Sequence, residues 1–202
     1  DFVIEKTCAN SLRVDFIEDI IPNAKYIYIK RNGLDSIYSI MQCWKASFSL
    51  IYTLKKFRYV PKIDIPYHGI NFIKNRLYKN NNDHLRFWGP RFTEVENVLN
   101  LSLDEIAAKQ WVSCVDKSNA SFKKINSKRV FELTYEDFVA SPKSQIEKIA
   151  KFIGLSIEDN IKFPLVNNSS VGKGMKKLSS FQMESIRPII KKTMIENNYS
   201  FN

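Results

Sequence analysis

The segment "KYIYIKRNGLDSIYSIMQCW", residues 25–44, decides the fold class of this chain. Its first part belongs to a β-branched and aromatic run, 24–31, whose composition is typical of an interior strand. Ile37, Ile40 and Met41 then recur at the spacing of one helical face. In an open parallel sheet, ligands bind beyond the carboxyl ends of the strands, where the next helices begin. The segment therefore predicts an α/β fold and also the place of a binding site.

The rest of the chain repeats this alternation of strand-like and helix-like segments. Further strands are predicted at 1–6 and 128–138, and helices at 10–21, 34–44, 102–125, 141–155 and roughly 179–197. Helix-end signals support three of these boundaries: Ser102 with Glu105 as a capping box, Pro142 at a first helical position, and Gly154 at a helix end. Such an order predicts βαβ units and a parallel sheet flanked by helices.

Residues 45–93 interrupt this order with a segment rich in Lys, Asn, Tyr and Phe. The segment holds ten lysines and arginines against two aspartates, which is most of the basic excess of the chain. We interpret it as a mostly helical or irregular insertion in a single domain spanning 1–202, and as a candidate lid that binds an acceptor. A solvated surface excursion explains the same composition equally well.

Charge and cysteine content narrow the classes of partner. The formal net charge of +10 favours anionic partners without choosing among them. Three scattered cysteines without a CxxC pair, and two histidines, predict no metal site and reduced thiols in a cytoplasmic protein. No apolar run approaches the length of a membrane span. Because the chain opens inside a strand-like run, we expect the natural N-terminus to lie upstream.

The strand–helix junction by itself has two interpretations. Arg31 at a strand end and Ser39 in the first turns of the helix would suit a phosphate, which guanidinium groups and helix N-termini bind well. An Arg31–Asp35 ion pair beside an ordinary turn at Asn32 and Gly33 would suit the same residues. The junction alone favours the second interpretation.

Three other segments change this balance. "EKTCAN" (5–10) follows a predicted strand, "LTYEDFVASP" (133–142) follows another, and "SSVGKGMKKLS" (169–179) is a basic, glycine-containing loop before the last helix. With the junction, and in this order, they resemble the sulfotransferase family that uses 3′-phosphoadenosine 5′-phosphosulfate. The family pattern runs E-K-T-P-x-N, R-D-x-x-D-x-x-x-S, Y-E-D-L-V-x-x-P and G-x-x-x-K. The resemblance is greatest to bacterial members and to their tyrosylprotein and carbohydrate sulfotransferase relatives.

The resemblance implies a P-loop-NTPase-like parallel sheet and a role for each matching residue. Arg31 and Ser39 would hold the 3′-phosphate of the donor, and Tyr135 would lie near the adenosine. Lys173, Gly174 and Met175 would wrap the 3′-phosphate through side chain and backbone. Lys6 would be the catalytic lysine, neutralising charge on the bridging oxygen as 3′-phosphoadenosine 5′-phosphate leaves.

Two departures from the family pattern stand out. Cys8 replaces the usual proline, and we expect it to be a small buried apolar residue rather than a base. The family's glycine- and threonine-rich loop for the 5′-phosphosulfate does not occur in these residues, so the domain is expected to be N-terminally incomplete. The catalytic base is expected upstream as well, because Glu5 would point to the face opposite Lys6.

The predicted function is therefore transfer of a sulfuryl group to an acceptor hydroxyl of a glycan, a peptide tyrosine or a small molecule. The basic insertion favours an anionic glycan or an acidic peptide. Two alternatives stay open: a nucleotide-binding remnant without catalysis, and a basic nucleic-acid-binding domain that stacks bases on Tyr and Phe. No recognisable nucleic-acid-binding motif is present, so a nucleic-acid partner is not expected.

Overall fold

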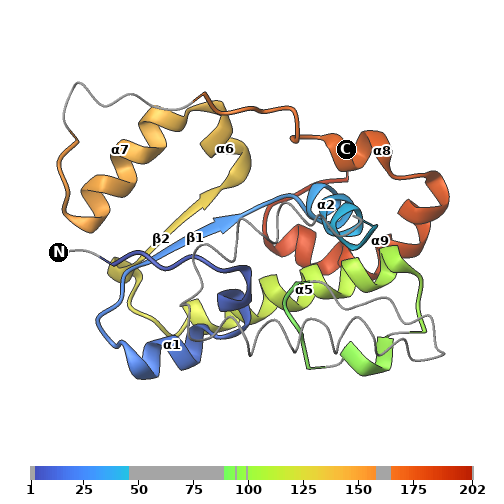
Figure 1. Cartoon of the computed structure of the whole chain (residues 1–202), viewed down its shortest axis with the longest axis horizontal. Helices are drawn as coiled ribbons and strands as arrows, with labels where there is room; N and C mark the ends of the chain where they lie inside the picture. The colour runs from blue at the N-terminus through green and yellow to red at the C-terminus, as the bar shows by residue number, and fades with distance from the viewer. Residues whose placement is uncertain (1–2, 46–88, 94, 99, 158–164, 202) are drawn as a thin grey trace, which may run out of the picture. The chain divides into compact units, whose positions relative to one another are not determined.

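A computed structural model describes residues 3–45, 89–93, 95–98, 100–157 and 165–201 of the chain (Figure 1). The chain divides into two compact units, 1–43 with 88–202, and 44–87. The second unit lies almost wholly outside the described residues, and so does the predicted lid at 45–93. Everything below concerns the first unit, apart from the last residues of one helix.

The described elements follow the α/β order. They are the strands β1 (Tyr26–Lys30) and β2 (Val130–Thr134); the helices α1 (Val14–Ile20), α2 (Gly33–Lys45), α5 (Leu103–Phe122), α6 (Tyr135–Ala140), α7 (Pro142–Ile153), α8 (Lys173–Lys177) and α9 (Ser180–Glu196); and 3-10 helices at Cys8–Leu12, Val95–Val98 and Ser127–Arg129.

The two strands form a small parallel sheet, as the alternation predicts. Ile27 pairs with Phe131 and Lys30 with Thr134, so both strands end at the same edge. Side chains alternate between the faces of a strand. Tyr28 on one face contacts Phe122 of α5, and Phe131 contacts Phe152 of α7. Helices therefore pack against both sides of the sheet, which confirms the α/β architecture in the described part of the chain.

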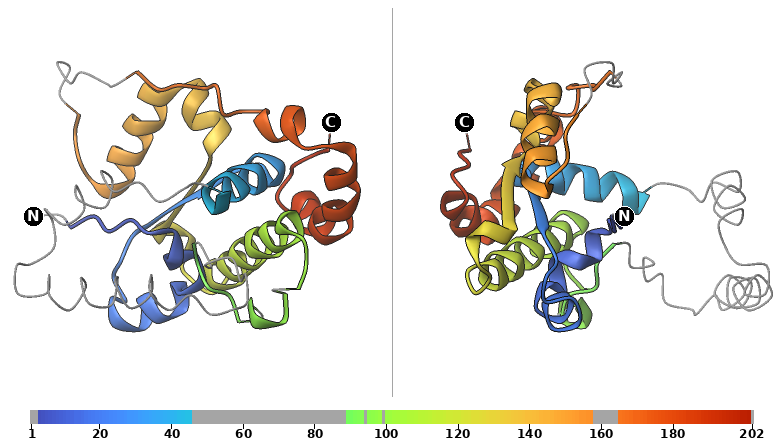
Figure 2. Two further views of the ribbon diagram at one scale, coloured as in Figure 1. Left: turned by 45° about the vertical axis from the view of Figure 1, so that its right-hand side comes forward. Right: turned by 90° about the vertical axis from the view of Figure 1, so that its left-hand side faces the viewer.

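The main core lies among helices rather than on the sheet. Buried residues of α2, α5 and α9, with Leu178 before α9, pack together: Leu34, Ile37, Met41, Ala107, Ala108, Trp111, Leu178, Ile186, Ile190 and Met194. The start of α2 is held closely in this core. A Cβ at Gly33 would lie 2.9 Å from both Trp111 and Met194, so only glycine brings the β1–α2 turn this near to α5 and α9. Figure 2 shows α2 following the carboxyl end of β1.

The helix-end signals are confirmed. Ser102 and Glu105 form the expected capping box at α5, and Pro142 opens α7. Gly154 follows α7 with φ 86°, the left-handed conformation that glycine adopts without strain. Local sequence therefore sets these boundaries correctly, since each depends on contacts within one turn.

The prediction of a buried strand at 1–6 is wrong for the residues described. Residues 3–7 are irregular and exposed, with Val3 at 97% and Ile4 at 80% relative exposure. A strand needs a neighbour that takes up its backbone hydrogen bonds, and the sheet of the described chain contains only β1 and β2. The prediction that Cys8 is buried is also wrong, since this residue is exposed. It directly follows the irregular segment 3–7, which packs into no sheet of the described chain.

The helix predicted at 10–21 is divided in two. A 3-10 helix ends at Leu12, and α1 begins at Val14 after a non-helical Arg13. The Ser11 hydroxyl donates a hydrogen bond to the Cys8 carbonyl at 2.7 Å. Such local side-chain bonds to the backbone compete with a regular helix.

Candidate functional site

The parallel register brings Arg31 and Tyr135 to one edge of the sheet. Each residue directly follows the last residue of its strand, and those last residues, Lys30 and Thr134, are paired. The Arg31 guanidinium carbon lies 4.6 Å from the centre of the Tyr135 ring, a cation–π distance. The sheet thus joins two predicted site residues that are far apart in the sequence.

Arg31 is only partly satisfied by the protein. Its Nη2 donates to the Ser170 carbonyl at 2.9 Å, and the Tyr135 hydroxyl lies 2.8 Å from the Ser170 hydroxyl. The Arg31 Nε is buried and has no hydrogen-bond partner in the described part of the chain. A buried N–H of a cationic group without an acceptor is uncommon and costly. The guanidinium thus keeps one N–H that no acceptor in the described part of the chain satisfies.

The β1–α2 turn is a capped turn without an Arg31–Asp35 ion pair among the described residues. Asn32 caps α2, since its Oδ1 accepts a hydrogen bond from the Leu34 N–H at 2.9 Å. The alternative with an Arg31–Asp35 pair is wrong, because no ion pair joins these two residues among those described. The Asp35 carboxylate instead accepts the backbone N–H groups of Gly172 at 2.8 Å and Gly174 at 2.6 Å. These two N–H groups lie more than a hundred positions away in the sequence, and they take the place that Arg31 would have had beside Asp35.

The predicted basic loop packs directly on the start of α2. Gly172 adopts φ 70°, and the short helix α8 follows it. Gly174 is buried, and a Cβ there would lie 2.2 Å from backbone atoms of Leu34. The Lys173 ammonium lies 5.9 Å from the Tyr38 ring of α2. We call residues 169–175 the loop segment from here on.

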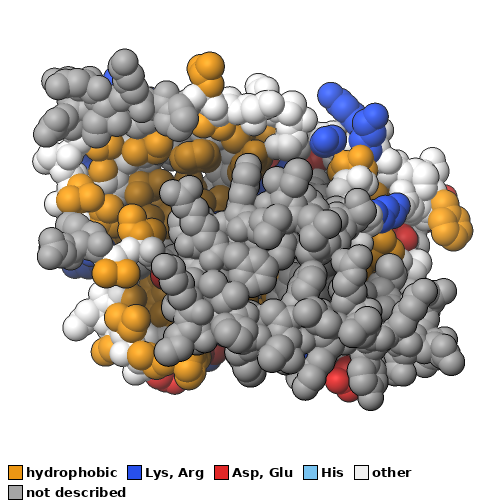
Figure 3. All heavy atoms as spheres, in the orientation of Figure 1, with side chains coloured by type: hydrophobic (Ala, Val, Ile, Leu, Met, Phe, Trp, Pro, Cys, Tyr) orange, Lys and Arg blue, Asp and Glu red, His pale blue; other side chains and the backbone are white. Residues whose placement is uncertain are grey.

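The surface around the start of α2 and α8 is basic, although the buried Asp35 carboxylate lies beneath it with both oxygens hydrogen-bonded. Lys173, Lys176 and Lys177 of α8 are exposed, and lysine and arginine side chains gather in this region of Figure 3. Ser39 is half-buried and lies one helical turn after Asp35, on the face of α2 that meets the loop segment. Lys173 approaches α2 at Tyr38, the residue that precedes Ser39.

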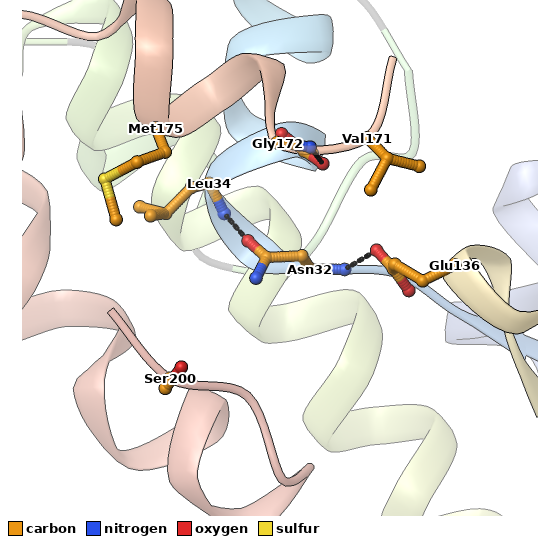
Figure 4. A pocket seen from close by; sticks show the side chains of 8 residues that line it. Asn32, Leu34, Glu136, Val171, Gly172, Met175 and Ser200 are labelled. Atoms are coloured by element: carbon orange, nitrogen blue, oxygen red, sulfur yellow. Dashed lines mark hydrogen bonds between the residues drawn. The ribbon is translucent and has the colours of Figure 1, made fainter. Parts of the chain in front are cut away.

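A pocket opens at this junction (Figure 4). Its lining comes from the β1–α2 turn, the start of α6, the loop segment and the C-terminal tail: Asn32, Leu34, Asp35, Glu136, Val171, Gly172, Met175 and Ser200. Met175 is the one predicted site residue among them. The sequence interpretation gave none of the others a binding role; in "YED" it chose Tyr135 and passed over the neighbouring Glu136.

Glu136 is the most connected of the missed residues. One carboxylate oxygen accepts the Asn32 N–H at 3.0 Å, and the other accepts the Tyr199 hydroxyl at 3.3 Å. Burial first, and then the Glu136 charge, raise the pKa of Tyr199, so this phenol stays protonated and donates. Glu136 thereby joins the β1–α2 turn to the C-terminal tail. A signal existed in the sequence, since an acid in the first turn of a helix near a strand end is well placed to accept N–H groups.

Lys6 is not brought into this group. It lies in the exposed segment 3–7, and no hydrogen bond or ion pair joins it to Arg31, Tyr135 or Lys173 in the described part of the chain. Within the same residues, no cluster of three His, Cys, Asp or Glu side chains could hold a metal ion. None of the described helices is both long enough and apolar enough to cross a bilayer.

Comparison with known proteins identifies the family. The model of the sulfotransferase domain matches residues 17–201, which covers both strands, α2 and the loop segment. A search of curated proteins finds no significant match. The chain belongs to the sulfotransferase domain family, a family of transferases whose members use 3′-phosphoadenosine 5′-phosphosulfate.

Proposed function

We propose that this sulfotransferase-domain chain moves a sulfuryl group to an acceptor hydroxyl, and that the donor's 3′-phosphate is held at the β1–α2 junction. Arg31, Ser39 and Lys173 would bind the phosphate, and Tyr135 would lie beside the adenosine. Gly174 and Met175 would shape the loop that covers it. When bound, 3′-phosphoadenosine 5′-phosphosulfate supplies the sulfuryl group and a nucleotide leaving group.

The observation that carries this proposal is the buried, unpartnered Nε of Arg31. The guanidinium is already oriented by the Ser170 carbonyl and the Tyr135 ring, so little side-chain freedom remains to be lost on binding. A phosphate oxygen at Nε would satisfy the buried donor with a charge-assisted bond. The nearby start of α2 and the exposed lysines of α8 favour the same negative charge.

The two carboxylates beside the pocket do not oppose this assignment. Asp35 and Glu136 are both occupied by N–H or O–H donors of the protein. Hydrogen bonds to a carboxylate stabilise its charge where it is and reduce its need for a cation. Arg31 therefore keeps its charge available for a ligand rather than for either acid.

Lys6 would act on the other side of the donor. Its proposed task is to neutralise the charge that builds on the bridging oxygen as the nucleotide leaves. Since Lys6 is exposed and has no hydrogen bond or ion pair with Arg31, Tyr135 or Lys173 among the described residues, donor binding would have to bring it to the transferring group. The acceptor class stays a proposal from charge: the basic segment 45–93 favours an anionic glycan or an acidic peptide.

Calorimetry with three ligands tests the proposal: 3′-phosphoadenosine 5′-phosphate, adenosine 5′-phosphate and a single-stranded oligonucleotide. We expect the first to bind best, and Arg31→Ala to weaken it by about 100-fold or more, as for loss of a charge-assisted pair. Arg187→Ala is the matched control, because Arg187 also stacks on an aromatic ring, Phe201, but lies on α9. Equal binding of both nucleotides, or tight oligonucleotide binding with a steep salt dependence, would refute the proposal.

A further inference from the structure

We propose that Asp35 is a positioning residue: its buried carboxylate fixes the loop segment on α2 so that Lys173 and Arg31 face one phosphate. The inference rests on the proposed function for the identity of the ligand. The attachment of the loop segment to α2 does not depend on that function, since it is made by hydrogen bonds within the chain.

The two hydrogen bonds of Asp35 bracket Lys173. Gly172 and Gly174 are its neighbours in the chain, and both donate their N–H groups to this one carboxylate, at 2.8 and 2.6 Å. Two bonds from flanking peptide groups fix the backbone direction at the residue between them. Lys173 therefore leaves the backbone in a set direction while its side chain stays exposed.

Burial makes this fastening strong and specific. Asp35 has 3% relative exposure, so water has little access to its carboxylate. A buried carboxylate that loses its donors is left with an unsatisfied charge, which is far more costly than a lost surface bond. The position of Asp35 in the first turn of α2 adds the favourable field of the helix N-terminus.

The shape of the loop segment agrees with this role. At Gly174 the backbone lies so close to Leu34 that no side chain fits between them. Gly172 adopts the left-handed conformation, and its N–H donates to the same carboxylate. An αL residue followed by a helical one directs successive N–H groups into one concave site, which commonly binds an anion. In this chain the Asp35 carboxylate is that anion.

The fastening extends to Arg31 through Ser170. The Ser170 carbonyl accepts from Arg31, and its hydroxyl pairs with Tyr135. Release of the loop segment from Asp35 would therefore loosen the acceptor that orients the guanidinium as well as the direction of Lys173. Because the Gly172 and Gly174 amides are occupied by Asp35, these two N–H groups are not available to the phosphate.

The test compares Asp35→Asn with Asp104→Asn in the full chain. Asp104 is the matched control, since it is also buried, at 6% relative exposure, and accepts the Ser185 hydroxyl at 2.5 Å, away from the pocket. The measured quantity is the ratio of the dissociation constants for adenosine 5′-phosphate and 3′-phosphoadenosine 5′-phosphate. A residue that only stabilises the fold would not change this ratio in the folded protein.

We expect Asp35→Asn to reduce the preference for the 3′-phosphorylated nucleotide by about 10- to 100-fold, the worth of one or two bonds to a charged group. Asp104→Asn should leave the ratio unchanged. Retention of the wild-type ratio in folded Asp35→Asn would overturn the inference and leave the proposed function intact. A wild-type protein without any preference would instead refute the proposed function.

Amide hydrogen exchange in the wild-type chain gives a second test that needs no variant. The Gly172 and Gly174 amides should be protected, and addition of 3′-phosphoadenosine 5′-phosphate should raise their protection together. Fast exchange of both amides, with or without the nucleotide, would overturn the inference even if Asp35→Asn does not fold.

Discussion

The β1–α2 junction and the segment 3–7 carry the two ends of the proposed donor site, and they differ in how firmly the chain holds them. At the junction, Arg31, Asn32 and Asp35 each have partners from segments more than a hundred positions away. In the segment 3–7, Lys6 is exposed and belongs to no strand. Tertiary contacts therefore hold the proposed phosphate end in place, whereas no tertiary contact that the described residues show holds Lys6 at the proposed sulfuryl end.

Substitution of Lys6 should have the strongest effect, and it should act on kcat rather than on nucleotide affinity. Lys6→Ala should lower kcat by about 100- to 1000-fold, as for loss of a group that stabilises developing charge, while the affinity for 3′-phosphoadenosine 5′-phosphate stays near the wild-type value. Steady-state kinetics with 3′-phosphoadenosine 5′-phosphosulfate measures kcat, and calorimetry with 3′-phosphoadenosine 5′-phosphate measures the affinity. Arg31→Ala is the contrasting variant, since its main effect should appear in nucleotide affinity. A Lys6→Ala protein with unchanged kcat would contradict the assignment.

The close approach of the loop segment predicts the next effect. Gly174→Ala should destabilise the fold by about 2–4 kcal/mol, because its methyl group would overlap the Leu34 backbone, which cannot move as a side chain can. Gly154→Ala is the matched control: it has open space around it and a positive φ of 86°, so we expect about 1 kcal/mol from strain alone. Thermal or denaturant unfolding measures both variants. Equal losses would show that the loop segment is not held tightly on α2.

A smaller effect should come from the bond between Glu136 and Tyr199, which joins the junction to the C-terminal tail. The single variants Glu136→Gln and Tyr199→Phe, and the double variant, form a cycle. We expect a coupling free energy of about 0.5–1.5 kcal/mol in unfolding, typical of a part-buried hydrogen bond to a charged group. A coupling near zero would mean that the tail is not fastened through this pair.

The smallest effect depends on pH and lies away from the site. Arg129 donates hydrogen bonds to Glu18 and so lowers the pKa of Glu18 below its ordinary value of 4.5. Because the folded pKa is the lower one, the pair stabilises the fold at pH values above 4.5, and this contribution is lost as the pH falls through the folded pKa. The stability advantage of wild type over Glu18→Gln should therefore shrink in acid, as followed by unfolding at several pH values. A stability advantage that is the same at every pH would contradict this assignment. Glu147→Gln is the control for general charge effects, because Glu147 lies in an exposed pair with Lys143 at 4.0 Å.

The sequence predicted the ends of strands and helices correctly wherever they depend on contacts within a single turn of the chain. The strand at 26–30, the capping box of Ser102 and Glu105, and the glycine end of α7 are all found where the sequence predicts them. The parallel sheet also followed from the order of the elements, and it brings Arg31 and Tyr135 to one edge as expected.

The structure overturned the predicted strand at 1–6 and the alternative of an Arg31–Asp35 pair, and in both a distant segment decides the outcome. Val3 and Ile4 have the composition of a strand, yet a strand exists only where a neighbour accepts its hydrogen bonds. Asp35 has a cation four positions away, yet two backbone amides of the loop segment satisfy it instead. No local pattern contains the information about which of these partners is nearer in space.

The α/β class, the ordered motifs of the sulfotransferase family and the charged residues at strand ends follow from the amino-acid sequence, because periodicity, turn chemistry and residue type are local properties. Three features follow from tertiary contacts instead: Asp35 holds the loop segment, Glu136 joins the turn to the tail, and the Arg31 Nε is buried without a partner among the described residues. Hydrogen-bond partnership and burial depend on which surfaces meet when the helices close on one core.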